Sequence, residues 1–268
     1  MPEVLLNDAK IYYEEQGTGP ETILFAHGLL WSGRMFAEQV KVLSQQYRCI
    51  TYDFRGQGKS QVTPSGYDIE SLYEDTVVLI EKLNCLPCHF AGLSMGGFVG
   101  MRLAIRHPKM LKSLILMETS ANPEPQENIH RYRMLNLVAR WIGLGLVADR
   151  VMPIMFGRNF MEDPARATER AAWRQMLVSN HRIGITKAVV GVINRLGVAD
   201  QLSRISTPTL IIVGDQDIAT VPAESELMHT RIPNSKLVVI PGAGHTSTVE
   251  EAAAVTSAIQ GFLAGSKG

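Results

Sequence analysis

Residues 89–97 read HFAGLSMGG, and this stretch decides the fold. A short apolar run ends at Leu93 and an amphipathic stretch begins after Ser94, which places the serine at a sharp turn between a strand and a helix. Such a turn strains the serine backbone, and side chains two residues before or after it would collide, so Gly92 and Gly96 keep it open. The pattern favours a nucleophilic serine over a serine that only caps the helix.

Strand-like and helix-like segments alternate on both sides of this turn. Apolar runs typical of strands cover residues 22–26, 48–52, 89–93, 111–117, 209–213 and 236–240. Helix-like stretches lie between or after them at residues 35–43, 69–83, 96–106, 222–229 and 248–263. The opening segments 4–6 and 11–15 predict an antiparallel hairpin that turns at Asn7-Asp8. The whole pattern predicts an α/β fold, with a mostly parallel sheet that helices cover on both faces.

Residues 121–200 interrupt this alternation. They contain no strand-like run, and apolar residues such as Leu135, Val138 and Ile142 recur at helical spacing. The insertion follows a strand at its carboxyl end, where α/β proteins have their sites. We therefore predict a helical cap over residues 121–200, inserted into a core of residues 1–120 and 201–268. Helices that merely extend the core are the alternative.

Composition limits the classes of function. The chain has 268 residues, with 26 Lys plus Arg against 26 Asp plus Glu, so its net charge supplies no overall attraction to nucleic acid or to an anionic membrane. No apolar run is long enough to span a membrane, and the first residues do not resemble a signal peptide. Three cysteines cannot form a disulfide framework and favour a reducing compartment. We expect a cytoplasmic protein with a small-molecule partner; the sequence leaves open whether it forms a homo-oligomer.

A nucleophilic serine requires a base, and His245 is the best placed of seven histidines. It ends the loop Pro241-Gly242-Ala243-Gly244-His245, directly after the predicted strand 236–240. Because the carboxyl ends of parallel strands meet at one edge of a sheet, this loop can carry the imidazole to Ser94. His27 also follows a strand, but it stands beside Gly28 in a candidate oxyanion loop.

Two carboxylates are candidates to orient that histidine. Asp217 follows the predicted strand 209–213, and Glu118 follows the strand 111–117. We favour Asp217, because its strand directly precedes that of the histidine, and we expect Asp215 to bond its own turn. Glu118 stays open as the alternative acid.

Further candidates complete the predicted site. The backbone N–H groups of Leu29 and Met95 are the candidate oxyanion donors, and Trp31 and Trp141 are the candidate substrate-binding side chains. The sequence shows no clustered histidine motif for a metal and no glycine-rich phosphate loop, so we expect neither a metal nor a cofactor. Cys85 and Cys88 have redox spacing, but without a second pair they carry little functional weight.

The chain resembles the α/β-hydrolase superfamily along nearly its whole length. The matching landmarks are His27-Gly28, Asp53–Ser60 (DFRGQGKS), Gly92–Gly97, Gly214–Asp217 (GDQD) and Gly242–His245 (GAGH). Within the superfamily it looks most like the 3-oxoadipate enol-lactonases and related small-molecule esterases. The resemblance implies a triad of Ser94, Asp217 and His245, and a structural role for the loop Asp53–Ser60.

The resemblance implies a serine hydrolase that cleaves a small carboxylic ester or lactone through an acyl-enzyme. Haloalkane dehalogenases and epoxide hydrolases of this fold use an aspartate nucleophile, which Ser94 argues against. Perhydrolases, C–C bond hydrolases and acyltransferases share the triad and stay open, as does a ligand receptor with incidental turnover. The apolar cap favours a substrate of low polarity, whereas its arginines could bind a carboxylate; the sequence leaves both open.

Overall fold

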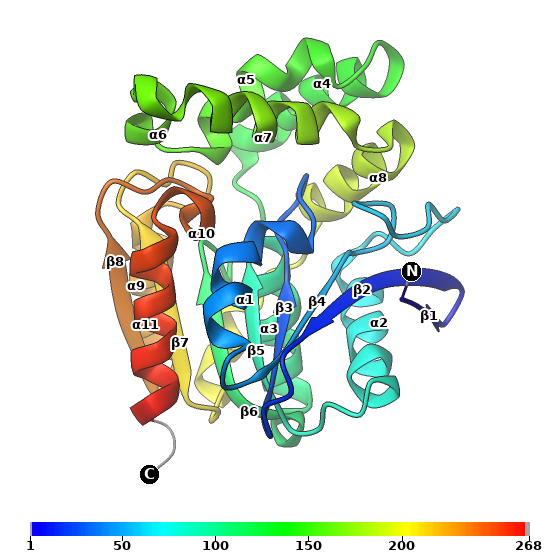
Figure 1. The fold of residues 1–268 in the computed structure, drawn as a ribbon. Helices are drawn as coiled ribbons and strands as arrows, with labels where there is room; N and C mark the ends of the chain where they lie inside the picture. Colours follow the sequence, from blue (N-terminus) through cyan, green and yellow to red (C-terminus); the bar gives the residue numbers. More distant parts are fainter. Residues whose placement is uncertain (1, 266–268) are drawn as a thin grey trace.

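The computed structural model describes residues 2–265 (Figure 1). Eight strands form one sheet in the order β1-β2-β4-β3-β5-β6-β7-β8. The strands are β1 (Glu3–Leu6), β2 (Ala9–Gln16), β3 (Thr22–Ala26), β4 (Arg48–Tyr52), β5 (Cys88–Leu93), β6 (Leu111–Met117), β7 (Thr209–Gly214) and β8 (Ser235–Ile240). Strands β3 to β8 run parallel to one another, and β1 and β2 add an antiparallel hairpin at the β4 edge. The predicted α/β fold is confirmed.

Alternating residues of each central strand supply two hydrophobic cores, one on each face of the sheet. In β3, Leu24 and Ala26 pack in the core under α2 (Ile69–Lys82), α3 (Met95–Arg106) and α9 (Pro222–Arg231). Ile23 and Phe25 pack in the other core, with α1 (Ala37–Leu43) and α11 (Ala252–Gly265), which lie in front of the sheet in Figure 1. Because both faces are covered, β3 is buried at every position, as its apolar run predicts.

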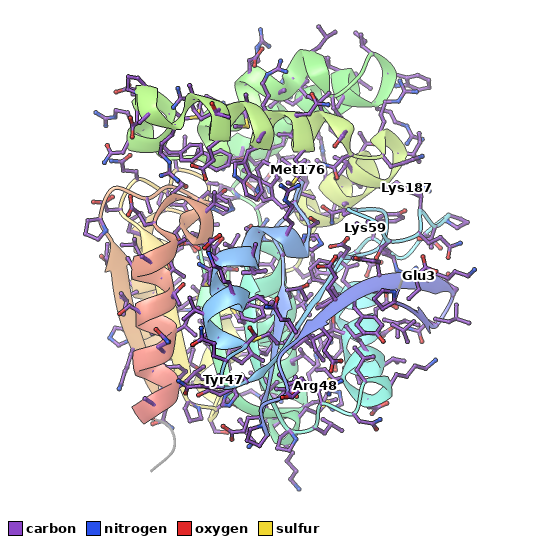
Figure 2. The ribbon with its side chains drawn as sticks, in the orientation of Figure 1. Glu3, Tyr47, Arg48, Lys59, Met176 and Lys187 are labelled. Atoms are coloured by element: carbon purple, nitrogen blue, oxygen red, sulfur yellow. The ribbon has the colours of Figure 1, made fainter. Side chains whose placement is uncertain are left out.

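Five α-helices connect β6 to β7, together with two short 3₁₀ helices, and the α-helices lie as a separate layer over one end of the sheet (Figure 1). They are α4 (Gln126–Trp141), α5 (Gly145–Met155), α6 (Arg158–Glu162), α7 (Ala167–Ser179) and α8 (Arg182–Ile193). This layer crosses the top of the molecule in Figure 1. Figure 2 shows Met176 of α7 between this layer and the sheet domain, and its side chain packs against the core that α1 and α11 cover. The predicted cap segment 121–200 contains no strand.

Two helices differ from the sequence expectation. The segment expected as one closing helix divides into α10 (Ser247–Glu250) and α11, with Glu251 between them at φ −130° and ψ 51°. The carboxylate of Glu250 turns inward to bind backbone N–H groups, and the chain bends at this point. The helix expected at residues 35–43 starts as a 3₁₀ turn over Gly33–Phe36 and becomes α-helical only in α1.

The three cysteines are free and buried. Burial raises the pKa of the Cys85 thiol to about 11 and also raises that of Cys88. A thiol with a raised pKa is a poor nucleophile at neutral pH, so the spacing of these cysteines reflects packing.

None of the helices within residues 2–265 combines the length and the apolar character that crossing a bilayer demands.

Candidate active site

Ser94 lies at the turn between β5 and α3 with backbone angles φ 52° and ψ −109°. This left-handed conformation is strained for a residue with a Cβ atom. A Cβ atom on Gly92 would lie 2.3 Å from the carbonyl oxygen of Gly96, so the first glycine prevents a collision across the turn. A Cβ atom on Gly96 would lie 2.1 Å from the carbonyl oxygen of Ala26, so the second lets α3 approach the neighbouring strand β3.

The structure brings Ser94, His245 and Asp217 together in one hydrogen-bonded series. The Oγ atom of Ser94 lies 2.9 Å from Nε2 of His245, and Nδ1 of His245 lies 2.9 Å from Oδ2 of Asp217. The three residues follow β5, β8 and β7, whose carboxyl ends share one edge of the sheet. With Nδ1–H donating to Asp217, Nε2 is left to accept the serine proton. This arrangement suits nucleophilic attack by an activated serine.

A short turn after β7 fixes the Asp217 carboxylate. Its Oδ1 atom accepts hydrogen bonds from the backbone N–H groups of Ala219 and Thr220. Its Oδ2 atom accepts from the Thr220 hydroxyl at 2.8 Å, and that hydroxyl also lies 3.3 Å from Nδ1 of His245. Four donors therefore converge on a side chain that is 2% exposed. Sequence reasoning did not single out Thr220, and its expectation that Asp215 bonds its own turn is wrong: Oδ1 of Asp215 accepts from the N–H of Gly242 at 2.7 Å, and Asp217 makes the turn bonds.

Glu118, the alternative acid, lies near this series but forms no part of it. Its two carboxyl oxygens are buried and have no hydrogen-bond partner among the described residues. Burial, together with the nearby carboxylates of Asp217 and Glu250, raises the pKa of Glu118 well above its ordinary value. This shift favours the neutral carboxyl group over the charged carboxylate, which makes Glu118 the weaker candidate for stabilising a protonated histidine.

Glu250 fixes the loop that carries His245. Its Oε2 atom accepts from the N–H of Gly244 at 2.9 Å, and its Oε1 atom accepts from the N–H of Thr246 at 3.0 Å. These two N–H groups flank the histidine on either side. The Oε2 atom also accepts from Gly157 at 2.7 Å, which ties the loop to the cap. Sequence reasoning missed this residue, whose only signal is a carboxylate five positions after the histidine.

The candidate oxyanion loop after β3 is held by the loop that follows β4. Nδ1 of His27 donates to the carbonyl of Gly28, and Nε2 accepts from the N–H of Phe54. This pair of bonds requires a neutral imidazole, and burial lowers the pKa of His27 accordingly. Leu30 has φ 76°, and its N–H donates to the Gln57 side chain. This geometry supports the expected structural role of residues 53–60.

The two predicted oxyanion donors are backbone N–H groups without a partner in the described part of the chain. Met95 is the first residue of α3, where an N–H has no partner within the helix. Leu29 lies between Gly28 and Leu30, whose own N–H groups are both bonded to side chains. Leu29 lines the same cavity as Ser94.

A cavity of about 120 Å³ lies between the triad and the cap. Ser94, Thr220 and His245 form its polar floor. Apolar side chains of the cap cover most of the rest, including Leu135, Leu144, Val147, Val151, Leu177 and Ile185. An apolar cavity of about 150 Å³ holds one benzene molecule, so this space suits a small acyl group or ring. Within residues 2–265, no group of three or more His, Cys, Asp or Glu side chains is arranged to bind a metal ion.

The two tryptophans predicted to bind substrate do not line this cavity. Trp31 is 1% exposed and packs edge-on against the rings of Phe156 and Trp173, so it joins the cap to the core. Trp141 is 75% exposed at the end of α4. The cavity face of α4 instead carries Tyr132, Leu135, Asn136 and Ala139 at helical spacing. Trp141 lies two residues past the last of these, on another side of the helix.

Comparison with known proteins assigns the architecture to a family. A family model described as the alpha/beta hydrolase fold matches residues 21–252. The chain belongs to this family. The landmarks that support the resemblance, from His27-Gly28 to Gly242–His245, all lie within the matched residues or at the strand ends described above.

Other α/β hydrolases resemble the chain over nearly its whole length. A thermophilic esterase from Thermogutta terrifontis has 31% sequence identity and a TM-score of 0.90, with 99% of this chain and 98% of that chain covered. A 3-oxoadipate enol-lactonase from Acinetobacter baylyi is 30% identical, covering 90% of this chain and 88% of its own length. A putative carbamate hydrolase from Pseudomonas syringae is 26% identical, covering 90% and 93%. The chain is therefore an α/β hydrolase with relatives among enzymes that cleave acyl bonds.

Proposed function

We propose that this α/β hydrolase cleaves small carboxylic esters or lactones, with Ser94 as nucleophile, His245 as base and Asp217 as the orienting acid. The observation that carries the proposal is the series of two 2.9 Å contacts from Ser94 Oγ through His245 to Asp217, at the floor of an apolar cavity. The similarity to a named esterase and a named enol-lactonase supports the same reaction class.

The first half-reaction forms an acyl-enzyme. The Oγ atom of Ser94 attacks the carbonyl carbon while its proton passes to Nε2 of His245. The N–H groups of Leu29 and Met95 stabilise the oxyanion of the tetrahedral intermediate, each contributing about 3–4 kcal/mol in a preorganised site. The C–O bond then breaks, and the leaving alkoxide takes the proton from Nε2. With a lactone, the alkoxide stays attached to the acyl group, so ring opening replaces departure of an alcohol.

The second half-reaction releases the acid. His245 takes a proton from water, and the hydroxide attacks the acyl carbon. The C–O bond to Ser94 breaks, and Oγ regains its proton from the imidazole. Asp217 keeps the imidazole in the required tautomer through both steps and stabilises the imidazolium that forms. No step uses a cofactor.

A substrate panel tests this proposal. We expect purified protein to hydrolyse p-nitrophenyl esters of short acyl chains and simple lactones at rates far above one turnover per hour. Activity should fall as the chain outgrows the small cavity. The Ser94→Ala protein, checked for folding by circular dichroism, is the control. Absence of turnover on every ester and lactone, or equal turnover by the control, would refute the proposal.

A further inference from the structure

The wall of the catalytic cavity carries two charged side chains besides the triad, Glu124 and Arg195, among the residues that the structure describes. The Nη1 atom of Arg195 lies 2.5 Å from Oε2 of Glu124. The side chains are 3% and 6% exposed, so solvent screens the pair little. The two opposite charges give this part of the wall a net charge of zero.

Arg195 is held in place by further contacts. Its Nε atom donates to the carbonyl of Asn122 and its Nη1 atom donates to that of Val192. The guanidinium lies 4.3 Å from the centroid of the Phe98 ring, which is a cation–π contact. Phe98 stands four residues after Ser94 on α3, so the ring that Arg195 contacts lies one helical turn from the nucleophile. Ser94 and the two members of the pair line the same cavity, so an acyl chain that fills this cavity can reach the pair.

A carboxylate on the substrate would have no free cation to bind on this wall. To reach Arg195 it would need to compete with Glu124, and it would then lie beside a like charge with little water to screen it. The rest of the wall is mainly apolar, and its other polar side chains, Tyr132 and Asn136, carry no positive charge. Burying a carboxylate without a partner is unfavourable in free energy, because the charge loses its hydration, whereas an apolar chain has no charge to dehydrate.

Three other cations lie nearby, around a second cavity. Arg102, Arg140 and Lys187 line this adjoining cavity of about 620 Å³, which shares Asn136 and Arg195 with the catalytic one. Figure 2 shows Lys187 at α8, where its Nζ atom donates to the carbonyls of Thr63 and Pro64. None of these three cations lines the catalytic cavity itself.

We infer that the Glu124–Arg195 pair makes this enzyme selective for uncharged esters and lactones, and that it excludes substrates whose reacting acyl chain ends in a carboxylate. The inference rests on the proposed function. In this selectivity the protein differs from an enzyme whose lactone substrate carries a free carboxylate. Glu124 is then the specificity-determining residue, because it neutralises the one arginine on the wall of the cavity that the structure describes.

A matched pair of esters tests the inference. p-Nitrophenyl hexanoate and mono-p-nitrophenyl adipate have the same chain length and differ in a terminal methyl or carboxylate. We expect the wild type to favour the uncharged ester by at least about 100-fold in kcat/KM, as expected for burying an unpaired charge. Wild-type values within threefold of each other would overturn the inference and leave the proposed function intact. Cleavage of neither ester would overturn the inference, and it would overturn the proposed function too only if the protein also cleaves none of the other esters and lactones of the panel.

Variants identify the residue responsible. Glu124→Gln frees the charge of Arg195 and should reduce the preference for hexanoate by at least about tenfold, mainly by raising kcat/KM for the adipate ester. Glu127→Gln is the matched control, because it removes the same charge from an exposed position three residues away. It should leave the preference unchanged. A Glu124→Gln preference equal to that of wild type would contradict the assignment.

A second variant covers the case in which Glu124→Gln does not fold. Asn136→Lys adds a cation to the same wall without disturbing the ion pair. We expect it to reduce the preference for hexanoate by at least about tenfold as well, because the added charge can pair with the carboxylate. The same preference in folded Asn136→Lys and wild type would contradict the view that charge on this wall sets the selectivity.

Discussion

The loops at the sheet edge and the helices of the cap contribute different kinds of contact to one cavity. The loops place Ser94, Asp217 and His245 through directed hydrogen bonds, and further side chains such as Glu250 fix the backbone beside them. The cap contributes mainly apolar side chains, together with one ion pair. From this difference we expect the loops to determine the reaction and the cap to determine which substrates are accepted. Changes in one region should therefore leave the contribution of the other largely intact.

The largest expected effect belongs to the loops. Ser94→Ala should lower kcat on any accepted ester by about 10⁴–10⁶, because the attacking oxygen is lost while the oxyanion donors stay in place. The backbone strain at position 94 is the same for alanine, so the fold should persist. Steady-state kinetics on purified protein with matched circular dichroism measures this. An alanine variant that keeps more than a tenth of the activity would remove Ser94 from the mechanism.

The next largest effect compares the two candidate acids. Asp217→Asn should lower kcat by at least about 10³, because an amide cannot hold the imidazole in the required tautomer or stabilise its charged form. Glu118→Gln should cost less than about tenfold, because Glu118 makes no hydrogen bond with His245 and a glutamine resembles the neutral carboxyl that burial favours. Both are measured with one ester. The reverse ranking would transfer the acid role to Glu118.

Glu118 should also affect how stability depends on pH. Its pKa is raised in the folded protein, so the folded state binds its proton more tightly than the unfolded state does. Its stabilising contribution is therefore complete below the unfolded pKa of about 4.5 and is lost as the pH rises toward the folded pKa. Glu118→Gln removes this dependence.

Denaturant unfolding between pH 5 and pH 8 measures the effect as the free energy of unfolding. The variant should gain stability relative to wild type as the pH rises. A difference between the two proteins that stays constant over this range would show that Glu118 does not change its pKa on folding.

The smallest expected effect lies on the outer side of the cap. Trp141→Ala should change kcat/KM less than twofold and the free energy of unfolding by about 0.5 kcal/mol or less, because this side chain is 75% exposed and absent from the cavity wall. Michaelis–Menten kinetics and thermal unfolding check this. A tenfold loss of kcat/KM would return Trp141 to the substrate site.

The sheet and the strand-end loops were predictable because their signals are local. A few neighbouring residues are enough to predict the local structure in each case. Examples are the apolar run of β5, the glycines around Ser94 and the loop Pro241–His245. Once the strands are known to be parallel, the shared edge that joins Ser94, Asp217 and His245 follows from topology.

The cavity wall was not predictable to the same degree, because its signals are not local. Helical spacing shows that residues such as Trp141 lie on a helix, but the face that reaches the cavity depends on how α4 packs on α8 and α5. The pairing of Glu124 with Arg195 joins residues 71 positions apart, and nothing in either neighbourhood indicates it. The hydrogen bonds from the His245 loop to Glu250 likewise depend on the bend between α10 and α11, which the spacing of apolar residues does not show.

Covalent labelling of the nucleophile tests the central claim most directly. Diethyl p-nitrophenyl phosphate offers a phosphorus atom to an activated serine: Oγ attacks, p-nitrophenolate leaves, and a stable diethylphosphoryl serine remains. We predict that one equivalent of p-nitrophenolate is released per chain, that activity is lost in parallel, and that mass spectrometry places a single adduct on Ser94, with none on the Ser94→Ala protein. Full esterase activity after prolonged exposure, or an adduct on another residue that accounts for the loss, would contradict the account.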